Sequence, residues 1–165
     1  PAGEIGEVVV RGPNVMQGYW NKKEQTAAVL KDGAYWTGGL GYMDDEGYVF
    51  LVDRSKDMIV NGGENVYCTE VEEILYQHPA ILEVAVFGVP DEKWGEAVWA
   101  VVVPREGNEI DKEQLIEFCR ERIATYKVPK GVDVQLEPLP KSGPGKVLKR
   151  ELRAPHWEDQ DRSVN

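Results

Sequence analysis

Residues 81–104 read ILEVAVFGVPDEKWGEAVWAVVVP, in which two runs of small and β-branched apolar residues flank the polar hexapeptide PDEKWG. Apolar runs of this length, rich in valine and bounded by turn residues, are typical of β-strands. Proline, aspartate and glycine in the hexapeptide favour a reversal of the chain. These residues therefore predict two strands, 81–89 and 96–104, joined by a short loop.

Helical patterns flank the two strands. Thr69 precedes EVEEILYQHP, where a threonine N-cap, early glutamates and a stop before Pro79 predict a helix. Asp111 caps a second predicted helix, KEQLIEFCRERI. Its apolar face consists of Leu115, Ile116, Phe118, Cys119 and Ile123. A last strand is predicted at 132–136, and VLKRELR at 147–153 predicts a short basic helix.

The first third of the chain has a different, mostly β pattern. Residues 3–12 predict a strand, 21–31 a brief helix, and 42–54 a hairpin with an acidic turn at Gly47. A second strand-like run begins at Asp57 and breaks at a pair of glycines. The two patterns meet near residues 53–56, where we predict a domain boundary.

Alternation of helices and strands in the later part predicts a small α/β domain there, with a three-stranded sheet and flanking helices. With the β-rich first part, the expected fold class is α+β.

Composition excludes several classes of function. The 165 residues carry a net charge of −10, which disfavours broad electrostatic binding to nucleic acid or to an anionic membrane. Basic and aromatic residues are not interleaved as in nucleic-acid-binding domains. Cys68 and Cys119 are far apart, which disfavours a disulfide scaffold or a zinc site and favours a reduced, cytoplasmic setting.

The sequence shows neither a membrane span nor a signal peptide. No apolar run has the length that crossing a membrane requires, so we expect no transmembrane segment. The start, PAGEIGEV, lacks the basic and apolar regions of a signal peptide and resembles an entry into the middle of a protein. We therefore treat the chain as a possible fragment.

Three glycines stand close together in YWTGGLGY, residues 35–42. A dinucleotide-binding fingerprint needs G-x-G-x-x-G between a strand and a helix, whereas Gly39-Leu40-Gly41 continues to Asp44 and a hairpin. The spacing excludes that fingerprint. A tight turn is the prediction from the residues alone.

Two further loops combine glycine with charge. KSGPGK, residues 141–146, lacks the first glycine of a P-loop and is followed by Val147, so it predicts an exposed loop that presents a lysine, or an ordinary solvated turn. Asn61-Gly62-Gly63 predicts a bulge approached by a ligand or a second backbone, or equally a plain turn. We find no catalytic triad, paired-carboxylate site or metal-ligand cluster in the sequence.

The order of the motifs is more specific than any one of them. GEIGEVVVRGPNVMQGYW at 3–20, YWTGGLGYMDDEGYVFLVDRSKDMIVNGGENVYCTEVE at 35–72 and PLPKSGPGKVLKREL at 138–152 resemble the C-terminal third of acyl-CoA synthetases, which are adenylate-forming enzymes. The likeness covers nearly the whole chain. The GGENVY form is similar to acyl- and aryl-CoA ligases, and the tail HWEDQDRSVN is similar to bacterial fatty-acyl ligases.

This resemblance implies a two-step ligase. ATP and a carboxylic acid, expected to be a fatty acid, give acyl-adenylate and pyrophosphate, and the thiol of CoA then displaces AMP. Mg²⁺ is expected mainly on a large N-terminal domain that also holds the acid. By this resemblance, 1–53 is the β-rich end of that domain, 54–56 is a hinge, and 57–165 is a mobile C-terminal domain that rotates between the steps.

The resemblance also implies roles for individual residues. Lys146 matches the lysine that contacts the carboxylate and the α-phosphate during adenylation, where it neutralises developing charge. Arg54 matches an arginine that hydrogen-bonds the ribose, and Lys56 matches the hinge position. Gly62 and Gly63 match a turn that lines the pantetheine tunnel, where a side chain would block the thiol.

Two positions depart from the family pattern. The pattern T-G-D-L supplies an aspartate for the ribose hydroxyls, but this chain has Gly39 at that place. Glycine accepts no such hydrogen bonds, so weaker nucleotide binding is expected. Cys68 stands where proline is common, a change expected to affect only local rigidity.

The resulting hypothesis is the C-terminal fragment of an acyl-CoA ligase, inactive by itself. Its partners would be the acid, ATP and CoA, and exposed strand edges in 1–53 would allow it to form homo-oligomers. The alternative is a stand-alone binding or interaction module that keeps the fold without catalysis.

Overall fold

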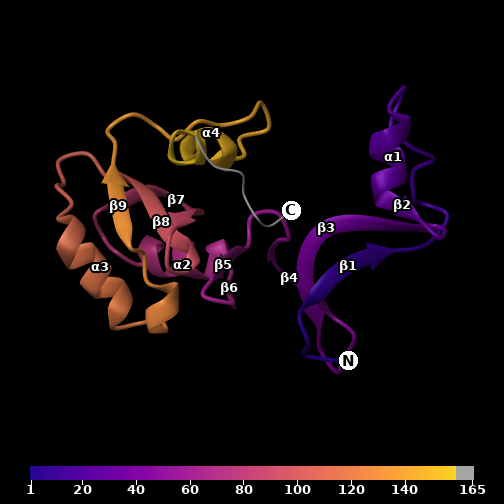
Figure 1. Cartoon of the computed structure of the whole chain (residues 1–165), viewed down its shortest axis with the longest axis horizontal. Helices are drawn as coiled ribbons and strands as arrows, with labels where there is room; N and C mark the ends of the chain where they lie inside the picture. The colour runs from indigo at the N-terminus through magenta and orange to yellow at the C-terminus, as the bar shows by residue number, and fades with distance from the viewer. Residues whose placement is uncertain (159–165) are drawn as a thin grey trace. The chain divides into compact units, whose positions relative to one another are not determined.

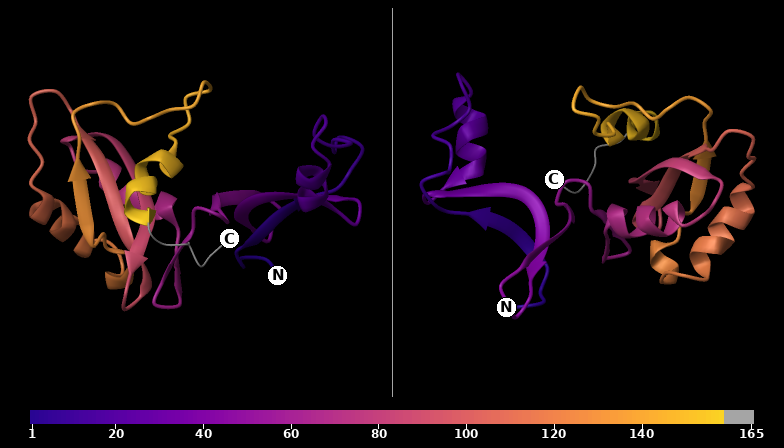
Figure 2. Two further views of the ribbon diagram at one scale, coloured as in Figure 1. Left: turned by 45° about the horizontal axis from the view of Figure 1, so that its top comes forward. Right: turned by 180° about the vertical axis from the view of Figure 1, so that it is seen from behind.

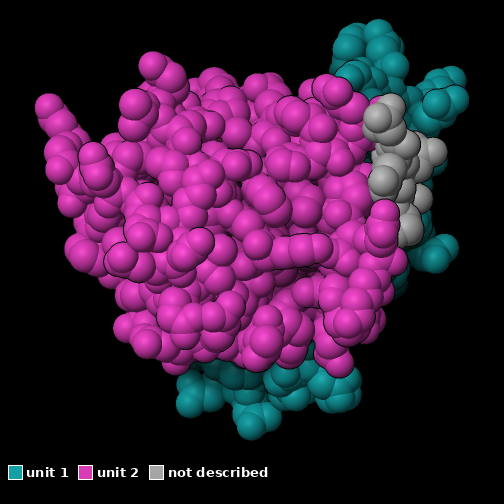
Figure 3. Space-filling model, turned by 60° about the vertical axis from the view of Figure 1, so that its left-hand side comes forward, with its two compact units in different colours: residues 1–56 teal, residues 57–165 magenta. Residues whose placement is uncertain are grey.

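The computed structural model describes residues 1–158. The chain divides into two compact units, Pro1–Lys56 and Asp57–Asn165, which Figure 3 colours separately. Each unit is considered by itself below.

The first unit is a four-stranded antiparallel sheet with one short helix (Figure 2). Its elements are β1 (Gly6–Val10), α1 (Lys23–Val29), β2 (Leu30–Lys31), β3 (Ala34–Met43) and β4 (Val49–Arg54). β3 pairs with each of the other three strands. The hairpin predicted at 42–54 is confirmed, and its turn is held by Asp44 Oδ1, which accepts hydrogen bonds from the N–H groups of Glu46 and Tyr48.

The tight turn predicted for the three glycines is wrong, because all three lie inside β3. The pairing of β3 with β1 and with β4 shifts register here, so the strand bulges. Gly38 has φ +69° and donates its N–H to Glu7 Oε1 at 2.8 Å. A Cβ on Gly41 would lie 2.5 Å from the carbonyl oxygen of Phe50, so glycine is needed for the close approach of β4.

The second unit is a sheet with helices on both faces (Figure 1). Its elements are β5 (Ile59–Asn61), β6 (Glu64–Val66), α2 (Cys68–Tyr76), β7 (Ile81–Asp91), β8 (Gly95–Pro104), α3 (Lys112–Arg120), the 3-10 turn η1 (Thr125–Lys127), β9 (Gly131–Val134), α4 (Lys149–Arg153) and the 3-10 turn η2 (Ala154–Trp157). The α+β class and the strands near 81–89 and 96–104 are confirmed.

The sheet has five strands rather than the three predicted. β8 pairs antiparallel with β7 and parallel with β9, and these three are the predicted strands. The hairpin β5–β6 joins them through the pair Asn61 and Gly95, a contact between residues far apart in the chain. That pairing has no local signal, because two three-residue strands carry almost no periodicity.

The central strands place alternate residues on opposite faces, which creates two apolar layers. Val84 and Val86 face the larger layer, which α2 and α3 cover with Val71, Leu75, Leu115 and Cys119. Ala85 and Phe87 face the smaller layer, which is covered by Leu139, Val147 and Leu152 from the C-terminal part of the chain. The smaller layer is therefore the one that supports the 141–146 loop.

One predicted helix cap is confirmed and the other is wrong. Asp111 Oδ1 accepts hydrogen bonds from the N–H groups of Glu113 and Gln114. Thr69 does not cap α2, because the helix begins one residue earlier at Cys68. The buried Cys68 donates its thiol hydrogen to the carbonyl of Asp57 at 3.0 Å, so tertiary packing fixes this helix start instead of a hydroxyl cap.

Candidate active-site surfaces

Gly39 and Arg54 lie opposite each other in the first unit, as paired residues of β3 and β4. The N–H of Gly39 donates to Thr37 Oγ1 at 3.0 Å, and Thr37 in turn donates to the carbonyl of Val8. A Cβ on Gly39 would meet only Thr37 Oγ1, at 3.3 Å. The backbone here does not itself require glycine, so the position has room for the side chain that the family pattern places there.

The segment that follows Arg54 is tied to the bulge of β3. Ser55 donates its N–H to the carbonyl of Gly38 at 2.9 Å, and Asp53 Oδ1 accepts the N–H of Arg54 at 2.7 Å. Both Arg54 and Lys56 are exposed. Lys56 is the last residue of the first unit.

Gly62 and Gly63 form the two-residue turn of the β5–β6 hairpin, between the paired residues Asn61 and Glu64. Their φ angles of +61° and +90° are those of a type I′ turn, which favours glycine. Gly62 also donates its N–H to the carbonyl of Trp94 at 2.9 Å, and a Cβ there would lie 2.7 Å from the Trp94 ring. The segment is thus a turn that is closely approached by a second part of the chain.

A pocket of about 300 Å³ borders this turn. Its lining residues are Asn61, Asp91, Lys93, Trp94, Ala97, Val98, Val128 and Lys130. The Lys93 ammonium lies 4.3 Å from the centre of the Trp94 ring, and the hydrogen bond from Lys130 holds the pKa of the Asp91 carboxyl below its usual range. The pocket thus combines an aromatic ring, the Lys93 ammonium, and a Lys130 ammonium that is already paired with the Asp91 carboxylate.

The sequence alone does not predict this pocket, because its lining residues come from segments more than sixty residues apart, such as Asn61 and Lys130. Trp94 beside Lys93 in a turn was the one local signal, since an aromatic and a cation there can stack on a ligand. Asn61 Nδ2 donates to the carbonyl of Tyr126 at 2.7 Å and so brings the turn to the 3-10 segment before β9.

Residues 141–146 form a small closed loop. Lys141 and Val147 pair across its base, and Ser142 donates its N–H to the carbonyl of Lys146 at 2.8 Å. Inside the loop, Ser142 Oγ accepts the N–H of Lys146 at 3.2 Å, and Gly145 adopts φ +84°. Lys146 is exposed, and in the described part of the chain its ammonium makes no hydrogen bond or ion pair. The loop thus presents a lysine whose charge is available to an anion.

The predicted residues therefore fall into three places. Gly39 and Arg54 are neighbours in the first unit, with Lys56 at its end. Gly62 and Gly63 share one turn of the second unit, and Lys146 lies on another loop of that unit.

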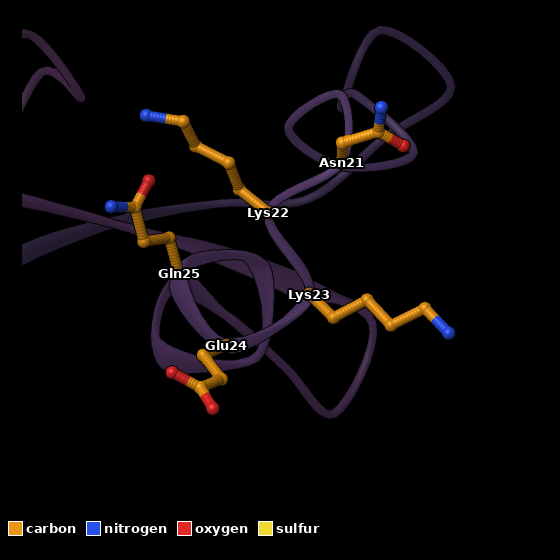
Figure 4. A pocket seen from close by; sticks show the side chains of 5 residues that line it. All are labelled: Asn21, Lys22, Lys23, Glu24 and Gln25. Carbon is orange, nitrogen blue, oxygen red and sulfur yellow. The ribbon is translucent and has the colours of Figure 1, made fainter.

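The other parts of residues 1–158 contribute little to a candidate site. No group of three acidic, histidine or cysteine side chains there could hold a metal ion. Of the helices in this range, none has the length and apolar character that crossing a membrane requires. A pocket of about 450 Å³ at the start of α1 is lined by five consecutive residues, but its two lysines, Lys22 and Lys23, point in different directions (Figure 4).

Comparison with known proteins assigns the family. Residues 70–146 match the family described as AMP-binding enzyme C-terminal domain. A long-chain-fatty-acid–CoA ligase of Bacillus subtilis (strain 168) is 54% identical over 90% of this chain, and a feruloyl-CoA synthase of an Amycolatopsis species is 52% identical over 93%. The chain corresponds to the C-terminal portion of an adenylate-forming enzyme.

The chain spans 26% and 31% of the lengths of those two relatives. The crystal structure of ATP-bound MatB from Rhodopseudomonas palustris, another similar protein, superposes with a TM-score of 0.87 at 41% identity. That match covers 94% of this chain and 31% of MatB. The adenylate-forming fold is therefore shared across both units of the chain.

Proposed function

We propose that the protein to which this chain belongs is an AMP-forming acid–CoA ligase. The relatives reported above are ligases or synthases of CoA thioesters, which supports the reaction class. The observation that carries the proposal is the setting of Lys146. This lysine is exposed, has no partner among the described residues, and lies on a closed loop at the end of the matched domain. An ammonium held in this way can neutralise the charge that develops between a carboxylate and a phosphate.

The other predicted residues receive roles in the same reaction. Arg54 would hydrogen-bond the ribose of ATP, and Lys56 would belong to the hinge between the two units. Gly62 and Gly63 would line the path of the CoA thiol, since their turn has no side chains. The pocket beside them would receive the nucleotide end of CoA, with the Trp94 ring near a base and the Lys93 ammonium near a phosphate.

For the acid, we propose a fatty acid. The supporting observation is the 54% identity to a long-chain-fatty-acid ligase, and the competing class is the aromatic acid used by the feruloyl-CoA synthase. The tail 156–165 is similar to that of bacterial fatty-acyl ligases, and its residues 159–165 lie outside the described residues. Comparing kcat/KM for saturated fatty acids of graded length and for ferulate, in the full-length protein, decides between the two.

We also propose that residues 1–165 alone form no adenylate, because the acid and the phosphates would be held mainly by a large N-terminal domain, and the chain spans only 26% of the length of the fatty-acid ligase relative. ATP-dependent thioester formation by this chain alone would refute that. A reducing, cytoplasmic location is proposed from Cys68 and Cys119, which are both buried thiols that form no disulfide.

Gly39 favours a second candidate function, a binding module without catalysis, because the family's ribose-binding carboxylate is missing. The two candidates differ in whether ATP is consumed.

Substitution of Lys146 tests the ligase. In the full-length protein, Lys146→Ala is expected to slow acid-dependent ATP–pyrophosphate exchange by about 100-fold or more, and to leave thioester formation from synthetic acyl-adenylate nearly unchanged. Lys112→Ala is the matched control, since Lys112 is an exposed lysine of α3 that lies 3.9 Å from Asp133. A wild-type protein without exchange activity would favour the binding module, and equal activity of Lys146→Ala and wild type would contradict the role of Lys146.

A further inference from the structure

We propose that Glu72 and Glu83 are positioning residues, which fix the two ends of the 141–146 loop and thereby place the ammonium of Lys146. This inference rests on the proposed function, in which Lys146 acts during adenylation. The two carboxylates come from different elements, α2 and β7, and neither lies on the loop itself.

Glu83 holds the segment that enters the loop. One carboxylate oxygen, Oε2, accepts the N–H of Leu139 at 2.9 Å, and the other accepts a hydrogen bond from the ammonium of Lys141. These two bonds hold the pKa of the Glu83 carboxyl below its usual range, with the bond from Lys141 as the main cause. Leu139 is itself buried in the smaller apolar layer. The entrance is therefore fixed by apolar packing and by an ionised carboxylate.

Glu72 holds the segment that leaves the loop. Its Oε1 atom lies 2.8 Å from the ammonium of Lys149 and accepts the N–H of Val86 at 2.8 Å. The side chains of Lys149 and Glu72 are only 17% and 16% exposed, so water screens this pair less than an exposed one. Val86 belongs to β7, which among the described strands pairs with β8 alone and so forms an edge of the sheet. Glu72 thus joins three elements at the sheet edge.

The loop between these two points has little freedom. Its base is closed by the pairing of Lys141 with Val147 and by the N–H of Leu148, which donates to the carbonyl of Pro140 at 2.8 Å. Lys146 is the residue just before Val147, and Lys149 follows three positions later. A shift at either carboxylate would therefore pass directly to the Lys146 backbone.

Removing the charge of either glutamate should affect catalysis more than it affects folding. Glutamine at either position can still accept the backbone N–H, so each variant keeps one of the two hydrogen bonds of the native carboxylate. A displacement of about 1 Å of a catalytic group, in contrast, can slow a reaction by about 100-fold. Removing the charge of Glu72 or Glu83 should therefore impair the step that uses Lys146 more than it impairs the fold.

The test compares the two half-reactions in the full-length protein. Glu83→Gln and Glu72→Gln are each expected to lower kcat for acyl-adenylate formation by about 10-fold or more, with KM for ATP unchanged within about two-fold. Thioester formation from supplied acyl-adenylate should stay within about two-fold of wild type, because that step does not use Lys146. A variant that slows both half-reactions equally would show a structural role and overturn the proposal.

Glu70→Gln is the matched control. Glu70 lies on the same helix, two residues before Glu72, and its carboxylate pairs with Lys127 on η1 instead of with the loop. The same loss of one charge there should leave the adenylation kcat near wild type. An equal loss of adenylation in Glu70→Gln would also overturn the proposal.

A second measurement separates this inference from the proposed function. Hydrogen exchange on the 165-residue chain should show faster exchange of the amides of 142–148 in Glu83→Gln and Glu72→Gln, and unchanged exchange there in Glu70→Gln. If the full-length wild type has no adenylation activity, the proposed function fails, while protection of the loop still decides whether the two carboxylates hold it. Unchanged loop exchange in both variants refutes the positioning role.

Discussion

Gly39 of β3 and Arg54 of β4 are direct cross-strand partners. If Arg54 has the ribose-binding role proposed above, the family pattern would place a ribose-binding aspartate opposite it, where this chain has Gly39. The structure leaves room for the missing side chain, since a Cβ on Gly39 meets only Thr37 Oγ1 at 3.3 Å. The local backbone geometry therefore does not require glycine at position 39. The difference from the family pattern is the loss of a carboxylate.

Restoring the carboxylate should strengthen nucleotide binding. A pair of charge-assisted hydrogen bonds contributes about 2–4 kcal/mol, so Gly39→Asp is expected to lower Kd for ATP by roughly 30-fold or more in the full-length protein. Isothermal titration measures this. Gly38→Asp is the control: at φ +69° it places an aspartate next door in a strained conformation and should give no gain in affinity. Equal affinities of wild type and Gly39→Asp would mean that another group already binds the ribose.

The β5–β6 turn should respond unequally to alanine at its two glycines. Gly62→Ala and Gly63→Ala each place a side chain at positive φ, which costs about 1–2 kcal/mol. Only the first also meets the Trp94 ring, at 2.7 Å, whereas Gly63 has open space. We expect urea unfolding of the chain to show Gly62→Ala as less stable by a further ~1 kcal/mol or more. This difference should shrink in a Trp94→Ala background, and its persistence there would exclude the ring as its cause.

Stability should fall at alkaline pH through Cys119. Burial raises the pKa of this thiol to about 11, with Arg122 opposing the shift, whereas an unfolded thiol ionises near its ordinary pKa. Above pH 9 the unfolded state therefore releases a proton that the folded state keeps, and unfolding becomes easier between about pH 9 and 11. The expected loss from pH 8 to pH 10 is on the order of 1 kcal/mol.

The measurement is the free energy of unfolding in urea at both pH values, for wild type and Cys119→Ala. Alanine leaves a cavity and lowers stability at every pH, but it should remove this part of the pH dependence. Identical pH slopes for the two proteins would count against the prediction.

The first unit should make the chain self-associate. Its strands expose large apolar side chains, including Leu51 at 75% and Val49 at 56%, and Trp20 is 89% exposed. Exposed apolar surface next to strand edges favours association. We expect sedimentation to show oligomers of residues 1–165 at micromolar concentration. Residues 57–165, which have their own apolar layers, serve as the comparison and should sediment as a monomer. A strictly monomeric 1–165 chain would contradict this expectation.

Much of the second unit could be predicted because its signals are local. The valine-rich runs around Val84 and Val101 are long enough to identify strands, and Asp111 caps the helix that immediately follows it. Local preference failed where a distant contact was stronger. Thr69 is a good cap by residue type, yet α2 begins at Cys68, which is buried and bonded to Asp57.

The glycines of β3 show the same limit in the first unit. Three glycines among four residues favour a turn when only neighbours are considered. In the structure, β1 and β4 flank this segment, and the close approach of the Phe50 carbonyl makes Gly41 part of a bulged strand. The prediction was wrong because strand pairing with distant residues decides the backbone conformation here.

The sequence by itself determined the family resemblance and the α+β class, and it singled out Lys146 of the KSGPGK loop as a candidate site residue. Each of these depends on residue identity at short spacing. Only the tertiary structure decided that Gly39 faces Arg54, that Trp94 packs on Gly62, and that Glu72 and Glu83 hold the two ends of the Lys146 loop. The physical reason is that these contacts join residues from 15 to 77 positions apart. Such pairs are brought together by sheet pairing and burial of apolar surface, which no local spacing records.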